Sequence, residues 1–162
     1  MAKHTQLYDY KAKEPVLLGG THSQFSTYDR VTWLPLKGAQ ELGDIGDIAE
    51  SVECTTIDDD RKVYCGGLKD SAEKELTIYY YDDEDQRALI AAAEAQQTIR
   101  IRHQWPNGTR ATYDLKLLGY QIMSGSADGF MQLKVSVRQA SDVVWSNADV
   151  AEQTQTTENE GE

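Results

Sequence analysis

Three histidines are the first residues to test for chemistry, because imidazole is the commonest metal ligand and a general base near neutral pH. His4, His22 and His103 are scattered along the chain, and none has a cysteine, carboxylate or second histidine at metal-ligand spacing. The glycine pairs at 19–20 and 66–67 lack the lysine and the strand–helix context of a phosphate loop, so we expect turns there. These residues predict neither a metal site nor a cofactor.

Two clusters of carboxylates could bind a hard cation or support hydrolysis. They lie at residues 58–60 and 82–85. Neither has the alternating ligands and central glycine of a calcium loop, and hydrolysis would need a cleft that holds two carboxylates at a set separation. A solvated loop explains the first cluster, and N-capping of a helix by Asp82 or Asp83 explains the second. We therefore expect no catalytic residue and no enzyme, with a hydrolase dependent on Asp82 or Asp83 as a remote alternative.

The two cysteines, Cys54 and Cys65, are too few for a disulfide framework. Their spacing is also not that of a zinc knuckle, which needs close pairs and two further ligands. We expect reduced, non-catalytic thiols, although the sequence does not decide whether the two ever pair.

The charge of the chain limits its partners. With 27 acidic and 16 basic residues, the formal net charge is −11. A protein that grips DNA normally presents a basic face, so tight binding to phosphates is not expected. The same charge suits a channel through which DNA slides without sticking, or simply keeps the protein soluble. Because neither a signal sequence nor an apolar run of about 20 residues is found, we expect a protein made in the cytosol that does not cross a membrane.

The patterns along the chain predict a mainly β fold, an antiparallel β-sandwich or barrel with one α-helix and flexible terminal arms. A chain of 162 residues suffices for one domain. We expect an N-terminal arm with one short strand over 1–30, the folded domain over 31–147 and an acidic tail over 148–162. The expected strands are at 31–36, 48–57, 73–81, 98–105, 109–122 and 130–139, the helix is at 84–96, and a long loop covers 58–68.

The strongest of these patterns is a three-stranded antiparallel meander. Residues 98–105, 109–122 and 130–139 alternate apolar and polar side chains, which is typical of strands with one buried face. Pro106, Asn107 and Gly108 form the turn between the first two strands. Tyr79 and Tyr81 lie on the second face of an earlier strand, which therefore also meets a partner.

This order of elements and three short strings resemble the lambda-like major tail tube family of siphophages. The strings are Leu-Gly-Asp-Ile-Gly-Asp-Ile at 42–48, Thr-Thr-Ile-Asp-Asp at 55–59 and Trp-Pro-Asn-Gly-Thr at 105–109. They are similar to the family's glycine-containing approach to a strand, to its Thr-Thr-Leu-Asp-Asp end and to its Phe-Pro-Asn-Gly-Thr hairpin. The resemblance spans 31–144, and the chain departs from some members by lacking an immunoglobulin-like domain at its C-terminal end.

The resemblance implies a virion protein whose subunits form hexameric rings that stack into a tube around a channel for DNA. It implies partners in the tape measure protein and in the tail tip and terminator proteins, with DNA in transit and no membrane. The loop that reaches the adjacent ring would comprise Thr56, Ile57, Asp58, Asp59, Asp60, Arg61, Lys62, Val63 and Tyr64. Packing between subunits would involve Tyr79, Tyr81, Ala92 and Ala93.

A different class of function stays open. A monomeric β-sandwich that binds a ligand, or a virion adaptor, would use the 58–68 loop as its recognition surface.

Overall fold

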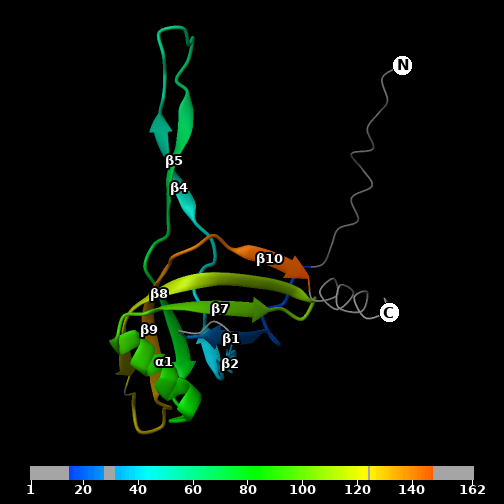
Figure 1. Cartoon of the computed structure of the whole chain (residues 1–162), viewed down its shortest axis with the longest axis vertical. Helices are drawn as coiled ribbons and strands as arrows, with labels where there is room; N and C mark the ends of the chain where they lie inside the picture. Colours follow the sequence, from blue (N-terminus) through cyan, green and yellow to red (C-terminus); the bar gives the residue numbers. More distant parts are fainter. Residues whose placement is uncertain (1–14, 28–31, 124, 148–162) are drawn as a thin grey trace, which may run out of the picture.

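The computed structural model describes residues 15–27, 32–123 and 125–147, which fold mainly into antiparallel β-structure with one helix (Figure 1). The expected fold class is confirmed. The parts of the expected terminal arms at 1–14, 28–30 and 148–162 lie outside the described residues. The elements are β1 His22–Ser26, β2 Leu34–Pro35, β3 Ala39–Glu41, β4 Ile48–Glu53, β5 Tyr64–Asp70, β6 Lys74–Tyr79, α1 Glu84–Glu94, β7 Thr98–Gln104, β8 Thr109–Met123, β9 Gln132–Gln139 and β10 Val144–Asn147.

Strand β8 organises the main sheet, whose strand order is β2-β1-β7-β8-β9-β6-β3. Its residues 110–116 pair with β7, and its residues 115–123 pair with β9. The register with β9 shifts between Leu117 and Gly119, and such bulges bend a strand and increase its twist. The third strand that pairs with β8 is β10, which is aligned with residues 109–112.

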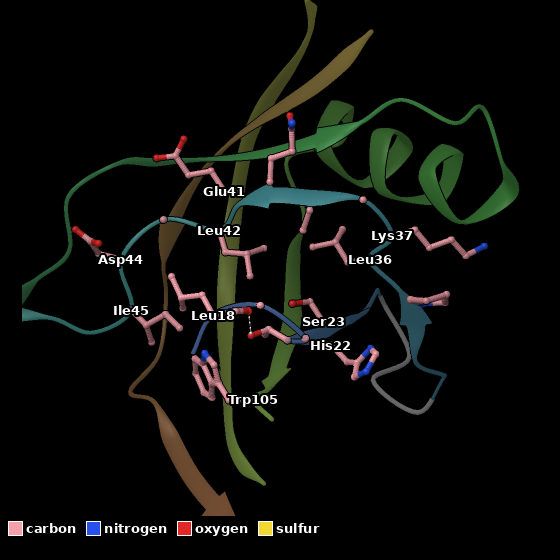
Figure 2. Close-up of a pocket in the computed structure, with 18 residues that line it drawn as sticks. Leu18, His22, Ser23, Leu36, Lys37, Glu41, Leu42, Asp44, Ile45 and Trp105 are labelled. Carbon is pink, nitrogen blue, oxygen red and sulfur yellow. Dashed lines mark hydrogen bonds between the residues drawn. The ribbon is translucent and has the colours of Figure 1, made fainter. Parts of the chain in front are cut away.

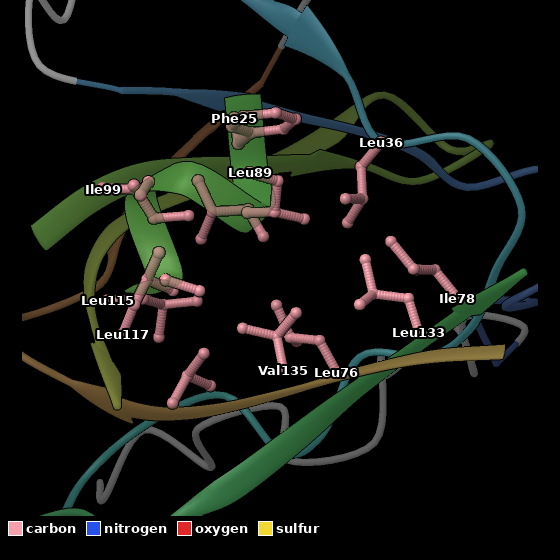
Figure 3. Packing of buried hydrophobic residues seen from close by; sticks show 14 of the residues in the cluster. Phe25, Leu36, Leu76, Ile78, Leu89, Ile99, Leu115, Leu117, Leu133 and Val135 are labelled. Carbon is pink, nitrogen blue, oxygen red and sulfur yellow. The ribbon is translucent and has the colours of Figure 1, made fainter. Parts of the chain in front are cut away.

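The core lies inside this curled sheet and is closed by α1 (Figure 3). The alternation predicted for the meander is confirmed, because its inward residues in β7, β8 and β9 are fully buried. The buried hydrophobic residues are Phe25, Leu36, Leu76, Ile78, Leu89, Ala92, Ala93, Ile99, Ile101, Ala111, Tyr113, Leu115, Leu117, Leu133, Val135 and Val137.

Helix α1 begins as predicted after an acidic cap. The Asp83 side chain accepts a hydrogen bond from the backbone N–H of Gln86 at 2.9 Å, which holds the pKa of Asp83 below its ordinary value. The buried Gln86 side chain then donates to the carbonyl of Tyr79 at 2.6 Å and accepts from the backbone N–H of Tyr81 at 2.9 Å. The helix is therefore tied to the end of β6 by its first turn.

The strand expected in the N-terminal arm exists, but it is part of the core. β1 lies between β2 and β7, and Phe25 is 1% exposed. Residues 22–26, which lie before the expected boundary at residue 30, are therefore part of the folded domain and not of an arm. The sequence HSQFS contains one large apolar residue, so its alternation gave too little signal. The strand expected over 31–36 is reduced to Leu34–Pro35, with residue 31 outside the described part.

A polar chain runs through the core between β1, β7 and β8. The Ser23 hydroxyl is 2.7 Å from His103 Nδ1, and His103 Nε2 is 2.9 Å from the Tyr113 hydroxyl. His103 is fully buried. Burial, reinforced by the nearby Lys74 ammonium, lowers the pKa of His103 to about 4, because the charged imidazole would lose its hydration.

This buried histidine predicts a specific acid sensitivity. Unfolded His103 titrates near its ordinary pKa of 6.5 and folded His103 near 4. Between these pH values the unfolded state binds a proton that the folded state does not. The free energy of unfolding therefore falls by about 3 kcal/mol as the pH drops from 6.5 to 4. His103→Gln should lower stability at pH 7 but remove this share of the pH dependence. Urea unfolding at pH 7, 5.5 and 4 checks it, and equal pH slopes in both proteins would contradict it.

Candidate assembly surface

A β-hairpin projects far from the body of the protein (Figure 1). It consists of β4 and β5, which form a separate two-stranded sheet, and we call residues 48–70 the projecting arm. None of these residues is buried. Cys54 and Gly67 are partly exposed, and all the others are exposed. Because a lone two-stranded hairpin is at best marginally stable in water, the arm needs a further restraint or a partner.

The projecting arm corrects the expected boundaries in this region. β4 ends at Glu53, and β5 begins at Tyr64, so residues 64–68 are strand where a long loop was predicted. The cause is Gly67, which suggested a turn but lies within β5. A Cβ atom there would be 3.0 Å from Val52 Cγ2 and 3.1 Å from the Glu50 carbonyl oxygen. Glycine thus permits the close approach of the two strands where their register shifts.

The tip of the projecting arm is a defined turn. The Asp59 carboxylate accepts hydrogen bonds from the backbone N–H of Thr56 at 2.8 Å and from the Thr56 hydroxyl at 2.9 Å. These bonds favour the charged carboxylate and lower the pKa of Asp59. Ile57, beside them, is completely exposed. Asp59 therefore stabilises the turn. This agrees with the solvated loop expected for the aspartate cluster.

A disulfide joins the two strands just below the tip, with the Cα atoms of Cys54 and Cys65 6.0 Å apart. The expectation of reduced thiols was wrong. The spacing of 11 residues carries no sign of pairing by itself, whereas the hairpin places the two residues side by side. Cys65 pairs with Val52 in the ladder, and side-chain alternation puts Cys54 on the same face as Val52.

The root of the projecting arm is tied to the end of β9 and to the segment after it. The backbone N–H of Gly46 donates to Gln139 Oε1 at 3.1 Å, and the Ser71 hydroxyl donates to the Gln139 carbonyl at 3.2 Å. Lys69 forms an ion pair with Asp142 at 2.9 Å, which raises the pKa of the lysine. The arm therefore starts from a fixed position on the body.

Apolar side chains are exposed on both strands and at the tip of the projecting arm. Leu68 is 91% and Ile48 83% exposed, and Val52, Ile57, Val63 and Tyr64 are also exposed. Scattered apolar residues are normal on a surface, but so many on one small hairpin make it a candidate interaction site. This surface contains the nine residues predicted to reach a neighbouring ring.

The four residues predicted to pack between subunits divide into two groups. Ala92 and Ala93 are 4% and 1% exposed within their own subunit, so their surface is used by the core and a neighbour cannot reach it. Tyr79 and Tyr81 remain accessible. They line a hollow of about 460 Å³ with Phe130 and Met131, and the Tyr79 ring lies edge-on to Phe130 with 6.0 Å between centroids.

A groove of about 750 Å³ lies between residues 18–23 and 35–45 (Figure 2). Leu18, Leu42, Ile45 and Trp105 line it. At its rim, Glu41 and Asp44 extend to one side and Lys37 to the other. No group of three or more metal-ligating side chains occurs among residues 15–27, 32–123 and 125–147. Within the same ranges, no helix is long and apolar enough to cross a membrane.

The turn between β7 and β8 lies next to this groove. Gly108 adopts a φ of 85°, and its N–H donates to the Trp105 carbonyl at 3.0 Å. The Asn107 side chain accepts from the N–H of Thr109 at 3.1 Å. Trp105 stacks on Trp145 of β10 with 5.7 Å between centroids. Pro106, Asn107 and Gly108 thus serve the fold by joining two strands.

The described part of the chain is a curled antiparallel sheet with one helix and an exposed projecting arm. The family model for the phage tail tube protein family matches residues 15–148, and the chain belongs to this family. It is therefore a structural component of the virion tail and not an enzyme. The predicted family resemblance is confirmed.

Solved structures share the fold at low sequence identity. A chain of the anti-feeding prophage baseplate, 6-fold symmetrised, has a TM-score of 0.67 at 9% identity over 85% of this chain and 99% of its own. The SPP1 tail tube has a TM-score of 0.63 at 13% identity, over 82% of this chain and 80% of its own. The tail of the empty GTA particle, obtained by helical refinement with C6 symmetry, has a TM-score of 0.61 at 12% identity, over 77% of this chain and 94% of its own. No curated protein matches the chain.

Proposed function

We propose that this protein is the major tail tube subunit, which forms hexameric rings that stack around a channel for phage DNA during ejection. The observation that carries the proposal is the projecting arm, a hairpin whose apolar side chains meet no partner within the described chain. Stacking would give each arm a surface on the adjacent ring. The contact residues are those from Thr56 to Tyr64, together with the strands behind them.

Closure into a ring of six is supported by the sheet and by the solved relatives. The main sheet ends in β2 and β3, which are two very short strands. Within the described residues, no further strand pairs with the outer edge of either. Ring formation would cover such edges, which otherwise invite uncontrolled association. The GTA tail has C6 symmetry. Tyr79 and Tyr81 would lie at the contact between neighbouring subunits, beside Phe130.

The charge supports DNA as the cargo. The fold alone does not decide it, because the anti-feeding prophage baseplate shares the fold with the SPP1 tail tube. If the channel wall shares the acidic balance of the chain, whose net charge is −11, it would offer phosphates few cationic partners and DNA would pass without being held. Before ejection the channel would hold the tape measure protein. The tube would be bounded by tip and terminator proteins, and the subunits would assemble in the host cytoplasm.

Polar substitutions on the projecting arm test the proposal. Ile57→Ser combined with Leu68→Ser should leave folding unchanged, because both side chains are already exposed in the free subunit. The same change should raise the concentration at which tubes form by about ten-fold or more, because buried apolar area at the ring contact is lost. Pelleting of tubes over a concentration series measures this.

A conservative pair provides the control. Ile57→Val with Leu68→Met keeps the surface apolar and should assemble nearly as the unmodified protein does. If the serine pair assembles normally, the arm is not the ring contact. If size-exclusion chromatography shows a monomer at every concentration, the alternative of a monomeric binding module or virion adaptor replaces the tube subunit.

A further inference from the structure

The disulfide lies where the projecting arm has least other support. Its root is fixed to Gln139 and Asp142, but no core packs against its outer half. The described polar contacts there are exposed, such as the ion pair between Lys62 and Glu53 at 3.1 Å. Exposed ion pairs contribute little to stability. The covalent bond is therefore the main restraint on the relative positions of the two strands near the tip.

The geometry places the bond on the ladder itself. Val52 pairs with Cys65, and the backbone N–H of Cys54 donates to the Val63 carbonyl at 2.9 Å. The disulfide thus connects one residue of the Val52–Cys65 pair to one residue of the adjacent Cys54–Val63 hydrogen bond. Opening it would free residues 54–65 to sample many conformations, since a cross-link acts mainly by restricting the disordered alternatives.

We propose that the oxidation state of Cys54 and Cys65 regulates assembly, with the closed disulfide preparing the projecting arm for its contact in the next ring. The inference rests on the proposed function of the arm. A reduced arm must lose conformational freedom when it is ordered at a contact, and an oxidised arm has lost it already. Oxidised subunits therefore assemble at a lower concentration than reduced ones.

The chemistry needs an oxidant, for which glutathione disulfide suffices. One cysteine thiolate attacks it, forms a mixed disulfide and releases one glutathione thiol. The second thiolate then attacks the mixed disulfide, closes the Cys54–Cys65 bond and releases the second glutathione. Two protons and two electrons pass from the protein to two glutathione molecules. Cys65 is exposed and Cys54 partly exposed, so both can react in the free subunit. They are the chain's two cysteines, which leaves no competing pair within it.

Linkage makes the effect reciprocal. If closing the bond favours assembly by a given factor, assembly must stabilise the bond against reduction by the same factor. In the reducing host cytoplasm, subunits would then assemble with open bonds and at a higher concentration. Release into an oxidising medium would close the bonds and stabilise the finished tubes.

The test compares tube formation by the full chain with and without reductant. Reduction should raise the critical concentration, measured by pelleting, about ten-fold. Cys54→Ser/Cys65→Ser should assemble like the reduced protein and show no response to reductant, while circular dichroism shows the same fold. In glutathione buffers of graded ratio, the bond in tubes should require about ten-fold more reducing conditions than in free subunits.

Three outcomes overturn the inference. An unchanged critical concentration on reduction, with assembly still sensitive to Ile57→Ser and Leu68→Ser, would remove the redox control and leave the role of the arm intact. Equal reduction of the bond in tubes and free subunits would contradict the linkage. If no tubes form under any condition, the proposed function and the redox control both fail.

Discussion

Removing the projecting arm is expected to abolish tubes without unfolding the protein. Ala49 pairs with Lys69 in the ladder. Residues 50–68 can therefore be replaced by the dipeptide Asn-Gly, which favours the tight turn of a two-residue hairpin. Because no side chain of the arm is buried, the melting temperature should change by only about 2 °C. Assembly should become undetectable at about 100 times the critical concentration of the unmodified protein, since the proposed ring contact is gone.

A second variant separates loss of the arm's structure from loss of its length. Replacing residues 50–68 by a flexible Gly/Ser chain of the same length keeps the reach but removes the strands and their apolar surface. It should also fail to assemble. Sedimentation velocity and negative-stain images measure both variants, with circular dichroism as the check on folding. Normal tubes from either variant would contradict the role of the arm, and an unfolded short variant would show that the arm supports the core.

The second large effect concerns β1. Phe25→Ala should lower the free energy of unfolding by about 3–5 kcal/mol, because it removes a fully buried aromatic side chain and leaves a cavity between the sheet and α1. For a domain of this size, such a loss is a large fraction of the total stability. Urea unfolding followed by circular dichroism measures it.

Leu17→Ala is the matched control, since Leu17 is close to β1 in the sequence but 77% exposed. Its substitution should change stability by less than about 0.5 kcal/mol. A loss below about 1 kcal/mol for Phe25→Ala would mean that β1 is a detachable part of an N-terminal arm, as its sequence alone suggests.

The best-predicted parts of the fold are those where one period lasts for many residues. β7, β8 and β9 alternate over long stretches, so their buried faces were assigned correctly from the sequence. Asp83 was a foreseeable cap because acids follow it in the first turn of the helix. In both cases local chemistry and tertiary packing favour the same structure.

Other parts depend on contacts between distant residues and left little trace in the sequence. β10 is four exposed residues that become a strand by pairing with β8. Ala92 and Ala93 suited a subunit contact by their size, but the core of the same subunit uses them. The disulfide follows from the way the hairpin folds, not from the spacing of its cysteines.

The hairpin proposed as the assembly surface was predicted only in part. Residues 56–64 were expected in a loop that reaches a neighbour, and the structure places them at and below the tip of the projecting arm. The continuation of the arm through β5 was missed, because the glycines at 66–67 are typical of turns. Leu68, a central residue of the proposed contact, was therefore assigned to the end of a loop.

In the proposed tube, the projecting arm of one subunit contacts the adjacent ring. Cryo-electron microscopy of tubes assembled from the purified full chain tests it most directly. The expected map shows stacked hexameric rings in which Ile57 and Leu68 are buried against a subunit of the next ring and carboxylates outnumber ammonium groups on the channel wall. Arms that point into solvent on the outside of the tube, or a chain that stays monomeric at every concentration, would contradict it.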